Sequence, residues 1–200
     1  LVSFGVLAKP SAYKAGVLKS AIAFLREQFE AQADEVLAAY GERYVIRVMG
    51  SASGEFVEVE HLLQFNRALE DVLGRAGFTR YWKAYGRATT RNPVFRPVVD
   101  GLMRLFGSGR GLVKMLPRGT SLVGRNIGAM KVLELDADSA LIEYKGFPFK
   151  EHLALFCEAN RASIEGSLLI VASSASAELE GVYVGIGGYR MRLRWVDGAG

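Results

Sequence analysis

The sequence predicts an α+β protein, in which an N-terminal bundle of about five helices precedes a ββαββ unit whose strands form one antiparallel sheet. Apolar residues recur at helical spacing through most of residues 11–126, whereas short β-branched and aromatic segments follow residue 129. No linker long enough to divide domains separates the two patterns. We therefore expect a single domain over 1–200, with the helical part at about 11–126 and the ββαββ part at about 129–196.

Capping residues, glycines and prolines divide the helical part. Ser11 is expected to cap the first helix and Gly41 to end it. Pro93 disfavours helix at the residue before it, and Pro117 is expected to bend the last helix or to restart it. The expected helices are 11–40, 55–73, 78–90, 94–106 and 112–125. A short extended connection or a single turn is expected at 44–49.

The second part begins where the spacing of apolar residues changes. Asp-Ala-Asp-Ser at 136–139 is typical of a turn between two strands. Gly187-Gly188 is typical of a tight hairpin turn, because glycine adopts positive φ without strain. The expected elements are strands at 129–135 and 140–144, a helix at 150–172, and strands at 178–186 and 189–196.

The positive charge of the chain is concentrated in one segment. The whole chain has 25 Lys and Arg against 21 Asp and Glu, a net charge of +4. Residues 80–131 contain eleven of the basic residues and one acid, Asp100. Helical spacing arranges most of these basic residues in stripes. The candidates for binding an anion or a partner are Arg80, Lys83, Arg87, Arg91, Lys114, Arg118 and Arg125. The partners left open are nucleic acid, an anionic lipid surface, an acidic protein face and a second copy of the chain, beside a merely solvated face.

Composition excludes several kinds of site. One cysteine, Cys157, allows no intrachain disulfide and no thiolate zinc site, and its apolar helix face predicts that it is buried. His61 and His152 lie far apart, and each is interpreted as a surface or hydrogen-bonded histidine in preference to a haem ligand. The glycine spacing at 119–124 lacks the lysine of a phosphate loop, and no nucleophile–base pair can be assembled. No metal site and no catalytic residues are therefore expected.

No targeting segment is expected from the sequence. No apolar segment reaches the roughly 18 residues that a membrane span requires. The first residues lack the basic region and the cleavage site of a signal peptide. A cytoplasmic location without a transmembrane segment is therefore expected.

Five sequence segments carry a resemblance to a known family. They are Gly16–Arg26, Glu70–Gly74, Tyr85–Thr89, Gly146–Pro148 and Tyr189–Trp195. Through these segments and the order of elements, over about residues 14–196, the chain resembles the myxobacterial paralogous family of unknown function. That family is similar to the 4-vinyl-reductase-like, TRAPP-like and haem-NO-binding-like fold group. The resemblance implies a regulatory or scaffold module, often dimeric, whose interior accepts a small hydrophobic ligand.

The chain departs from this fold group at two places. Vinyl-reductase-like domains usually carry cysteines around the last hairpin, but residues 181–189 contain none. The Tyr-x-Ser-x-Arg signature through which the haem sensors of the group hold the haem propionates is also missing. Neither metal nor haem binding is therefore carried over, and no cofactor is expected.

These observations predict a non-enzymatic regulatory or signalling module that dimerises, binds a small hydrophobic ligand and contacts a protein partner. The resemblance and the lack of a catalytic constellation support this prediction. The residues expected to line a ligand pocket, unless they are simply core, are Trp82, Tyr85, Phe95, Met103, Phe106 and Met115. One alternative is nucleic-acid or other polyanion binding through residues 80–131. A second alternative is an enzyme that acts on a small aromatic substrate.

Overall fold

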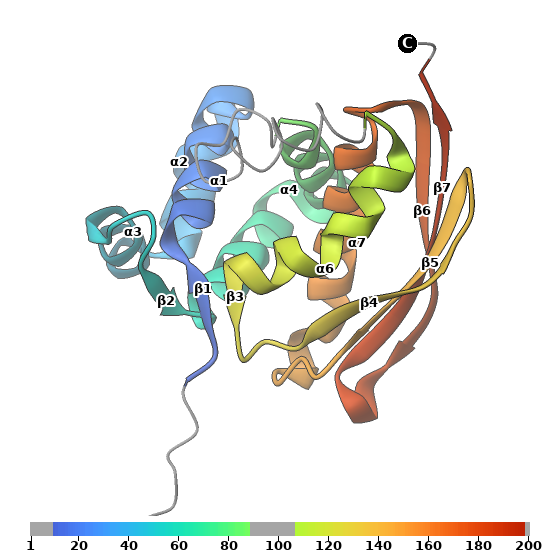
Figure 1. Ribbon diagram of the computed structural model, residues 1–200. Coiled ribbons are helices and arrows are strands. Elements are labelled where there is room, and N and C mark those ends of the chain that lie inside the picture. The colour runs from blue at the N-terminus through green and yellow to red at the C-terminus, as the bar shows by residue number, and fades with distance from the viewer. Residues whose placement is uncertain (1–9, 89–106, 199–200) are drawn as a thin grey trace, which may run out of the picture.

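The computed structural model describes residues 10–88 and 107–198. In chain order its elements are β1 (Ala12–Lys14), α1 (Ala15–Gln28), α2 (Glu30–Tyr40), α3 (Glu42–Gly50), β2 (Phe56–Glu58), α4 (Glu60–Arg87), α6 (Gly109–Val123), β3 (Gly124–Arg125), β4 (Ala129–Leu135), β5 (Ser139–Lys145), α7 (Leu153–Leu168), β6 (Ala172–Tyr183) and β7 (Gly188–Asp197). The fold is α+β, with helices in the N-terminal part and an antiparallel sheet in the C-terminal part, which confirms the predicted class (Figure 1).

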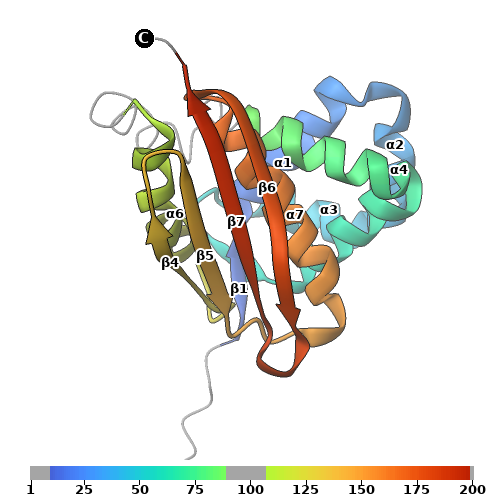
Figure 2. The same ribbon diagram turned by 90° about the vertical axis from the view of Figure 1, so that its right-hand side faces the viewer.

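The larger sheet has four antiparallel strands in the order β4-β5-β7-β6. Helices α6 and α7 lie against one face of this sheet, and α4 lies on the far side of α7 (Figures 1 and 2). The predicted strands at 129–135 and 140–144 are confirmed as β4 and β5 within a residue. The expectation of one sheet is wrong, because β2, β1 and β3 form a second sheet.

The opposite face of the larger sheet carries no helix in Figure 2. Arginines of β7 pair there with acids of β4 and β6. Arg192 contacts Glu134 at 2.5 Å and Glu180 at 2.8 Å, while Arg194 and Glu178 lie 3.6 Å apart. Alternating polar residues thus cover the face that the helices leave open.

The small sheet overturns the prediction for the start of the chain. Residues 12–14 pair with residues 56–58 and 124–125 instead of beginning a helix. Ser11 caps no helix: its hydroxyl donates to the carbonyl oxygen of Asn126 at 2.7 Å. The pairing partners lie far along the chain, so nothing in the local spacing of residues 11–14 indicates them.

The expected long first helix is two helices. Phe29, with φ −132°, interrupts the helical backbone between α1 and α2, and its ring lies 5.5 Å from that of Tyr81. The extended connection or single turn expected at 44–49 is wrong, because these residues belong to the nine-residue helix α3. Tyr44 stacks on Tyr40, with 5.5 Å between ring centroids, and donates to Glu60 Oε1 at 2.7 Å. These tertiary contacts override the β propensity of the segment.

Helix α4 is interrupted at the expected break. Gly74 has a non-helical backbone, with φ +67° and ψ 172°, so α4 consists of two helical segments that meet at a kink, and the predicted end of the second helix at Leu73 is confirmed. The kink brings together residues on both sides, since the ring centroids of Phe65 and Trp82 lie 6.4 Å apart. A positive φ at this position explains why glycine occupies it.

Helices α4 and α7 approach each other through glycines. A Cβ atom at Gly86 would lie 2.1 Å from the carbonyl oxygen of Ser163, and one at Gly166 would lie 1.9 Å from that of Lys83. No side chain fits into these gaps, so the two backbones are in direct contact. Such contact fixes the spacing of the two helices at the centre of the molecule.

A network of ion pairs joins the same two helices. Arg161 of α7 contacts Glu158 at 2.5 Å and Glu165 at 2.9 Å. Lys83 of α4 lies 2.6 Å from Glu165, and the Thr79 hydroxyl donates to Glu158 at 2.8 Å. Burial disfavours the charged form of Glu158, but the hydrogen bonds from Arg161 and Thr79 outweigh it and hold the pKa of Glu158 below its ordinary value.

Several predicted boundaries need correction in the second half. Helix α6 begins at Gly109 and continues through Pro117 without restarting. Residues 150–152 form a 3₁₀ turn, α7 ends at Leu168, and β6 starts six residues before the expected strand. The last turn is also different, because Val184–Ile186 form a 3₁₀ turn and Gly188 already belongs to β7. Gly187, with φ +59°, is needed there, since a Cβ atom would lie 2.0 Å from the Phe147 carbonyl oxygen.

Some predictions fall outside the described residues or stay untested. The helix expected at 94–106 lies outside them, as do the last two residues of the one expected at 78–90. The assignment of a single domain stays a prediction. Within residues 10–88 and 107–198, no helix combines the length and the apolar character that crossing a membrane requires.

Candidate functional site

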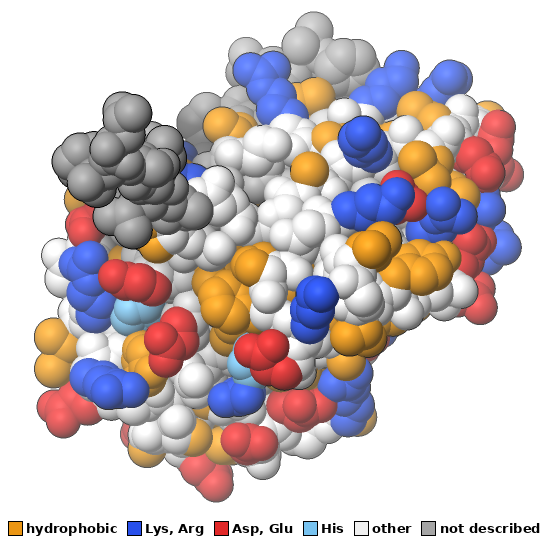
Figure 3. All heavy atoms as spheres, turned by 90° about the horizontal axis from the view of Figure 1, so that it is seen from below, with side chains coloured by type: hydrophobic (Ala, Val, Ile, Leu, Met, Phe, Trp, Pro, Cys, Tyr) orange, Lys and Arg blue, Asp and Glu red, His pale blue; other side chains and the backbone are white. Residues whose placement is uncertain are grey.

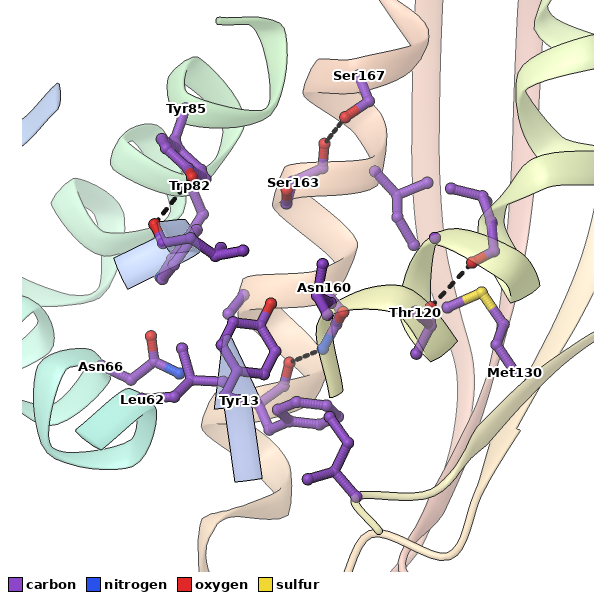
Figure 4. A pocket seen from close by; sticks show the side chains of 18 of the residues that line it. Tyr13, Leu62, Asn66, Trp82, Tyr85, Thr120, Met130, Asn160, Ser163 and Ser167 are labelled. Atoms are coloured by element: carbon purple, nitrogen blue, oxygen red, sulfur yellow. Dashed lines mark hydrogen bonds between the residues drawn. The ribbon is translucent and has the colours of Figure 1, made fainter. Parts of the chain in front are cut away.

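A cavity of about 210 Å³ lies where the helical part meets the sheet part. Helices α4, α6 and α7 form most of its wall, and β1 and the start of β4 complete it (Figure 4). Most of the lining is apolar, as with Leu62, Leu116 and Ile164. Among the described lining residues there is no Asp, Glu, Lys, Arg, His or Cys. The cavity is therefore suited to an uncharged, largely apolar molecule.

Most hydroxyl groups of the wall are already bonded within the protein. Tyr85 donates to the carbonyl oxygen of Val17 at 3.2 Å, and Thr120 donates to that of Leu116 at 2.9 Å. Ser167 donates to the Ser163 carbonyl oxygen at 2.9 Å. These hydroxyl groups have hydrogen-bonding partners without a ligand. They therefore contribute to the shape of the cavity but do not require a polar ligand.

Three other polar side chains of the wall differ from these hydroxyls. The Tyr13 hydroxyl points into the cavity in Figure 4, and burial raises its pKa above the usual range, with Tyr85 adding to the effect. Both polar atoms of the Asn66 side chain are buried without a partner among the described residues, as is Trp82 Nε1. The cavity wall thus contains a neutral phenol together with a buried amide and a buried indole N–H.

The residues expected to line a pocket divide into two groups. Trp82, Tyr85 and Met115 lie on the cavity wall. Trp82 and Tyr85 also belong to an aromatic cluster, with 5.5 Å between their ring centroids, so they serve the core as well. The remaining three candidates lie outside the described residues: Phe95, Met103 and Phe106. A ligand-binding role for any of the six stays a prediction.

Sequence reasoning missed Tyr13 and Asn66. Tyr13 was read as part of a helix, and only the register of β1 turns its side chain into the cavity. Asn66 carried a usable signal, because it lies four residues after Leu62 and three before Leu69, on the buried face of its helix. An amide at such a position requires a hydrogen-bonding partner, and the sequence offers no obvious one.

The described basic candidates lie on three elements, α4, α6 and β3. Lys83 is paired with Glu165, the Arg80 guanidinium lies 5.8 Å from the Phe29 ring, and that of Arg125 lies 4.2 Å from the Phe56 ring. The side chains of Arg87, Lys114 and Arg118 are exposed on α4 and α6, and Arg91 lies outside the described residues. Figure 3 shows one face of the molecule, on which basic and acidic side chains are interspersed. A role in anion or partner binding stays a prediction for these residues.

Both histidines have partners away from the cavity. His61 Nδ1 lies 3.4 Å from the Tyr40 hydroxyl, and its Nε2 lies 3.5 Å from Glu58. His152 Nε2 lies 3.3 Å from Arg67, which donates to it. Neither lines the cavity, and the described residues contain no cluster of His, Cys, Asp and Glu that could hold a metal ion. Cys157 is buried as expected, and burial raises its pKa to about 12, so the thiol stays protonated.

The buried His61 makes stability depend on pH. Burial holds its pKa below the ordinary 6.5, against the opposing charge of Glu58. As pH falls below about 6.5, the unfolded chain therefore binds the proton before the folded chain does, and stability decreases. Urea unfolding of the wild type at pH 7 and at about pH 5 is expected to show this loss, and His61→Gln should reduce it. His152→Gln is the control, because the less buried His152 should contribute less. Equal losses in wild type and His61→Gln would contradict the assignment.

Comparison with known proteins defines the class of fold. No protein-family model and no curated protein matches the sequence. Solved structures of H-NOX proteins match over most of the chain, so the fold is H-NOX-like. This confirms the haem-NO-binding-like part of the predicted fold group, while the resemblance to the myxobacterial family stays a prediction.

Three of these structures illustrate the match. The Fe(II) unliganded H-NOX protein from K. algicida superposes with a TM-score of 0.64 at 11% identity, over 94% of this chain and 98% of that one. An oxygen-binding H-NOX domain related to soluble guanylate cyclases, in its oxygen complex, gives 0.61 at 16% identity, over 91% and 94%. An H-NOX structure that probes heme distortion gives 0.61 at 15% identity, over 94% and 97%. At these identities the likeness concerns the fold alone.

Proposed function

We propose that this protein is a non-enzymatic sensor module that binds a small, uncharged, largely apolar molecule in the cavity between α4, α6 and α7. The observation that carries the proposal is the cavity itself, which is lined mostly by apolar side chains and lies between the helical part and the sheet. An apolar cavity of about 150 Å³ is large enough to bind benzene in another protein, so about 210 Å³ admits a substituted ring. The H-NOX-like fold supports a ligand-sensing role.

We further propose that the ligand is not haem. Haem iron is held in most proteins by His or Cys, and neither lines the described cavity. Tyrosine binds the iron as a phenolate, but burial keeps the Tyr13 hydroxyl protonated and the Tyr85 hydroxyl donates to Val17. Methionine typically binds haem iron together with a histidine, and no histidine lines the described cavity. The two propionates of haem would be buried there without a cation, which is costly. The cavity is also smaller than the roughly 300 Å³ at which pockets for drug-sized ligands begin. The residues present therefore do not fit this group.

Binding of a neutral aromatic probe tests the proposal. Cumene is expected to raise the unfolding temperature, because a ligand that binds only the folded state stabilises it. Ala159→Leu should abolish this rise, since Ala159 of α7 lines the cavity. Ala154→Leu is the matched control, because Ala154 is exposed on the same helix and should leave binding unchanged.

Two results would contradict the proposed function. One is an unfolding temperature that no neutral aromatic probe changes in the wild type. The other is equal binding of cumene by folded Ala159→Leu and by the wild type, which would put the ligand elsewhere. Circular dichroism of both variants separates lost binding from lost folding.

The signalling output is part of the same proposal. A sensor requires a surface that a partner or a second copy of the chain contacts. The turn between β6 and β7 presents exposed apolar side chains, among them Tyr183, Val184 and Ile186, which supports a contact there. Polyanion binding through the basic residues and an enzymatic activity remain the alternatives, and no observation on the described residues favours them over the cavity.

A further inference from the structure

We propose that the cavity selects ligands whose polar end carries a hydrogen-bond donor and an acceptor side by side, as a carboxamide or a lactam does, with Asn66 as their partner. This inference rests on the proposed function, because it names the class of ligand that the same cavity takes. It assigns to Asn66 the role of a specificity-determining residue. Three properties of the wall lead to it: an unpaired amide, a neutral surround and a limited volume.

The unpaired amide is the principal observation. Asn66 is 1% exposed, and neither its Nδ2 nor its Oδ1 has a partner among the described residues. Leaving a buried amide without hydrogen bonds costs roughly 1–3 kcal/mol, and folded proteins pair most such groups. In Figure 4 the side chain of Asn66 extends from α4 on the side where Leu62 and Tyr13 lie. Asn66 also lines the cavity, so a ligand bound there is positioned to supply the missing partner.

The two atoms of the amide define the chemistry of that partner. Nδ2 donates and Oδ1 accepts, so both are satisfied by a group with an acceptor next to a donor. Trp82 Nε1, which is also buried without a partner among the described residues, adds a second donor, and Trp82 lines the same cavity. A ketone or an ether would leave Asn66 Oδ1 without a donor. A hydrocarbon would leave Asn66 Nδ2, Asn66 Oδ1 and Trp82 Nε1 all without a partner.

Charge and size narrow the class further. No ionisable acid or base other than tyrosine lines the described cavity, so a carboxylate or an ammonium group would be buried without a counter-ion. The volume of about 210 Å³ limits the apolar body to about one ring with a short substituent. The ligand class is therefore a small, neutral, ring-containing amide or lactam.

Four probes of equal size test this selectivity. Benzamide offers a donor and an acceptor, acetophenone only an acceptor, cumene neither, and benzoate a charge. Calorimetric titration of the wild type and of Asn66→Leu gives the affinity for each. Asn66→Leu is expected to weaken benzamide about tenfold or more and to strengthen cumene, while benzoate binds neither protein. Ala159→Leu should block every probe, which ties them to the same cavity.

The outcomes separate this inference from the proposed function. If cumene binds and Asn66→Leu changes the affinities for benzamide and cumene by the same factor, the inference is overturned, because Asn66 is then satisfied by water or by nothing. If none of the neutral probes binds the wild type, the proposed function fails as well. If Asn66→Leu does not fold, nitrogen NMR of the wild type decides. Benzamide should shift the side-chain amide resonance of Asn66 and cumene should not, and equal shifts would overturn the inference.

Discussion

Gly86→Ala is expected to destabilise the protein by about 3 kcal/mol, although it adds a single methyl group. The new Cβ atom would lie 2.1 Å from the carbonyl oxygen of Ser163, so α4 and α7 would have to move apart. Alanine favours a helix over glycine by about 1 kcal/mol, and this gain is too small to offset the displacement. Thermal unfolding should show a fall in Tm of about 6–12 °C.

Two further variants control this prediction. Gly166→Ala should cost a similar amount, and the double variant should cost less than the sum, because both methyl groups separate the same two helices. Gly119→Ala changes a helical glycine of α6 around which a Cβ atom would meet nothing within 4 Å. It should leave stability unchanged or raise it by up to about 1 kcal/mol. A loss at Gly119 as large as at Gly86 would show that backbone effects, not the helix contact, dominate.

Arg161→Met is expected to cost about 3 kcal/mol at pH 7. The side chain of Arg161 is 18% exposed, and those of its partners Glu158 and Glu165 are 13% exposed. Methionine keeps much of the apolar stem but leaves Glu158 with only the Thr79 hydroxyl, and leaves Glu165 with only Lys83. Two largely buried carboxylates would then lack their guanidinium. Urea unfolding of both proteins measures the difference.

The pH dependence of this loss identifies its cause. In the wild type, Arg161 helps to hold the pKa of Glu158 below 4.5, so the stability that it provides is present above that pH and is lost as pH falls through the folded pKa. The difference between wild type and Arg161→Met should therefore shrink in acid. Arg194→Met is the control, because Arg194 and Glu178 are 62% and 73% exposed and such pairs contribute at most about 1 kcal/mol. A pH-independent loss at Arg161 would indicate lost packing instead of lost charge pairing.

The parts of the fold that the sequence predicted are those that local periodicity determines. The helical spacing of apolar residues in α4 and α7, and the turn at 136–139 between β4 and β5, lie within single segments. The small sheet could not be predicted in this way. Its strands have two or three residues each, and Tyr13 pairs with Val57 and Gly124, which lie far along the chain. Such short strands are stabilised by pairing with distant segments, and their own residue pattern does not predict them.

Only large apolar and aromatic residues of the candidate site were predicted. Trp82 and Tyr85 were identified from their aromatic side chains on a helix face, which suits either a core or a cavity wall. Tyr13 was not predicted, because the direction of its side chain depends on strand register. Asn66 was not predicted either, although its position among apolar residues on a helix face indicates a buried amide. Residues 80–131 have a high net positive charge, but Glu165, which pairs with Lys83, lies on α7, far along the chain. Charge counted along the chain does not reveal pairing in space.

The arrangement of charges on the larger sheet also bears on how copies of the chain meet. Its outermost strands are β4 and β6, and no other strand of the described residues pairs with the outer edge of either. Glu178 and Glu180 stand on β6, and β4 carries Glu134 beside an irregularity in its register. A second copy that added its β6 to this edge would bring a second set of these carboxylates close to ones that Arg192 and Arg194 already pair, and the irregular β4 offers a poor template for further pairing. Pairing of two copies through these strand edges is therefore expected to be unfavourable.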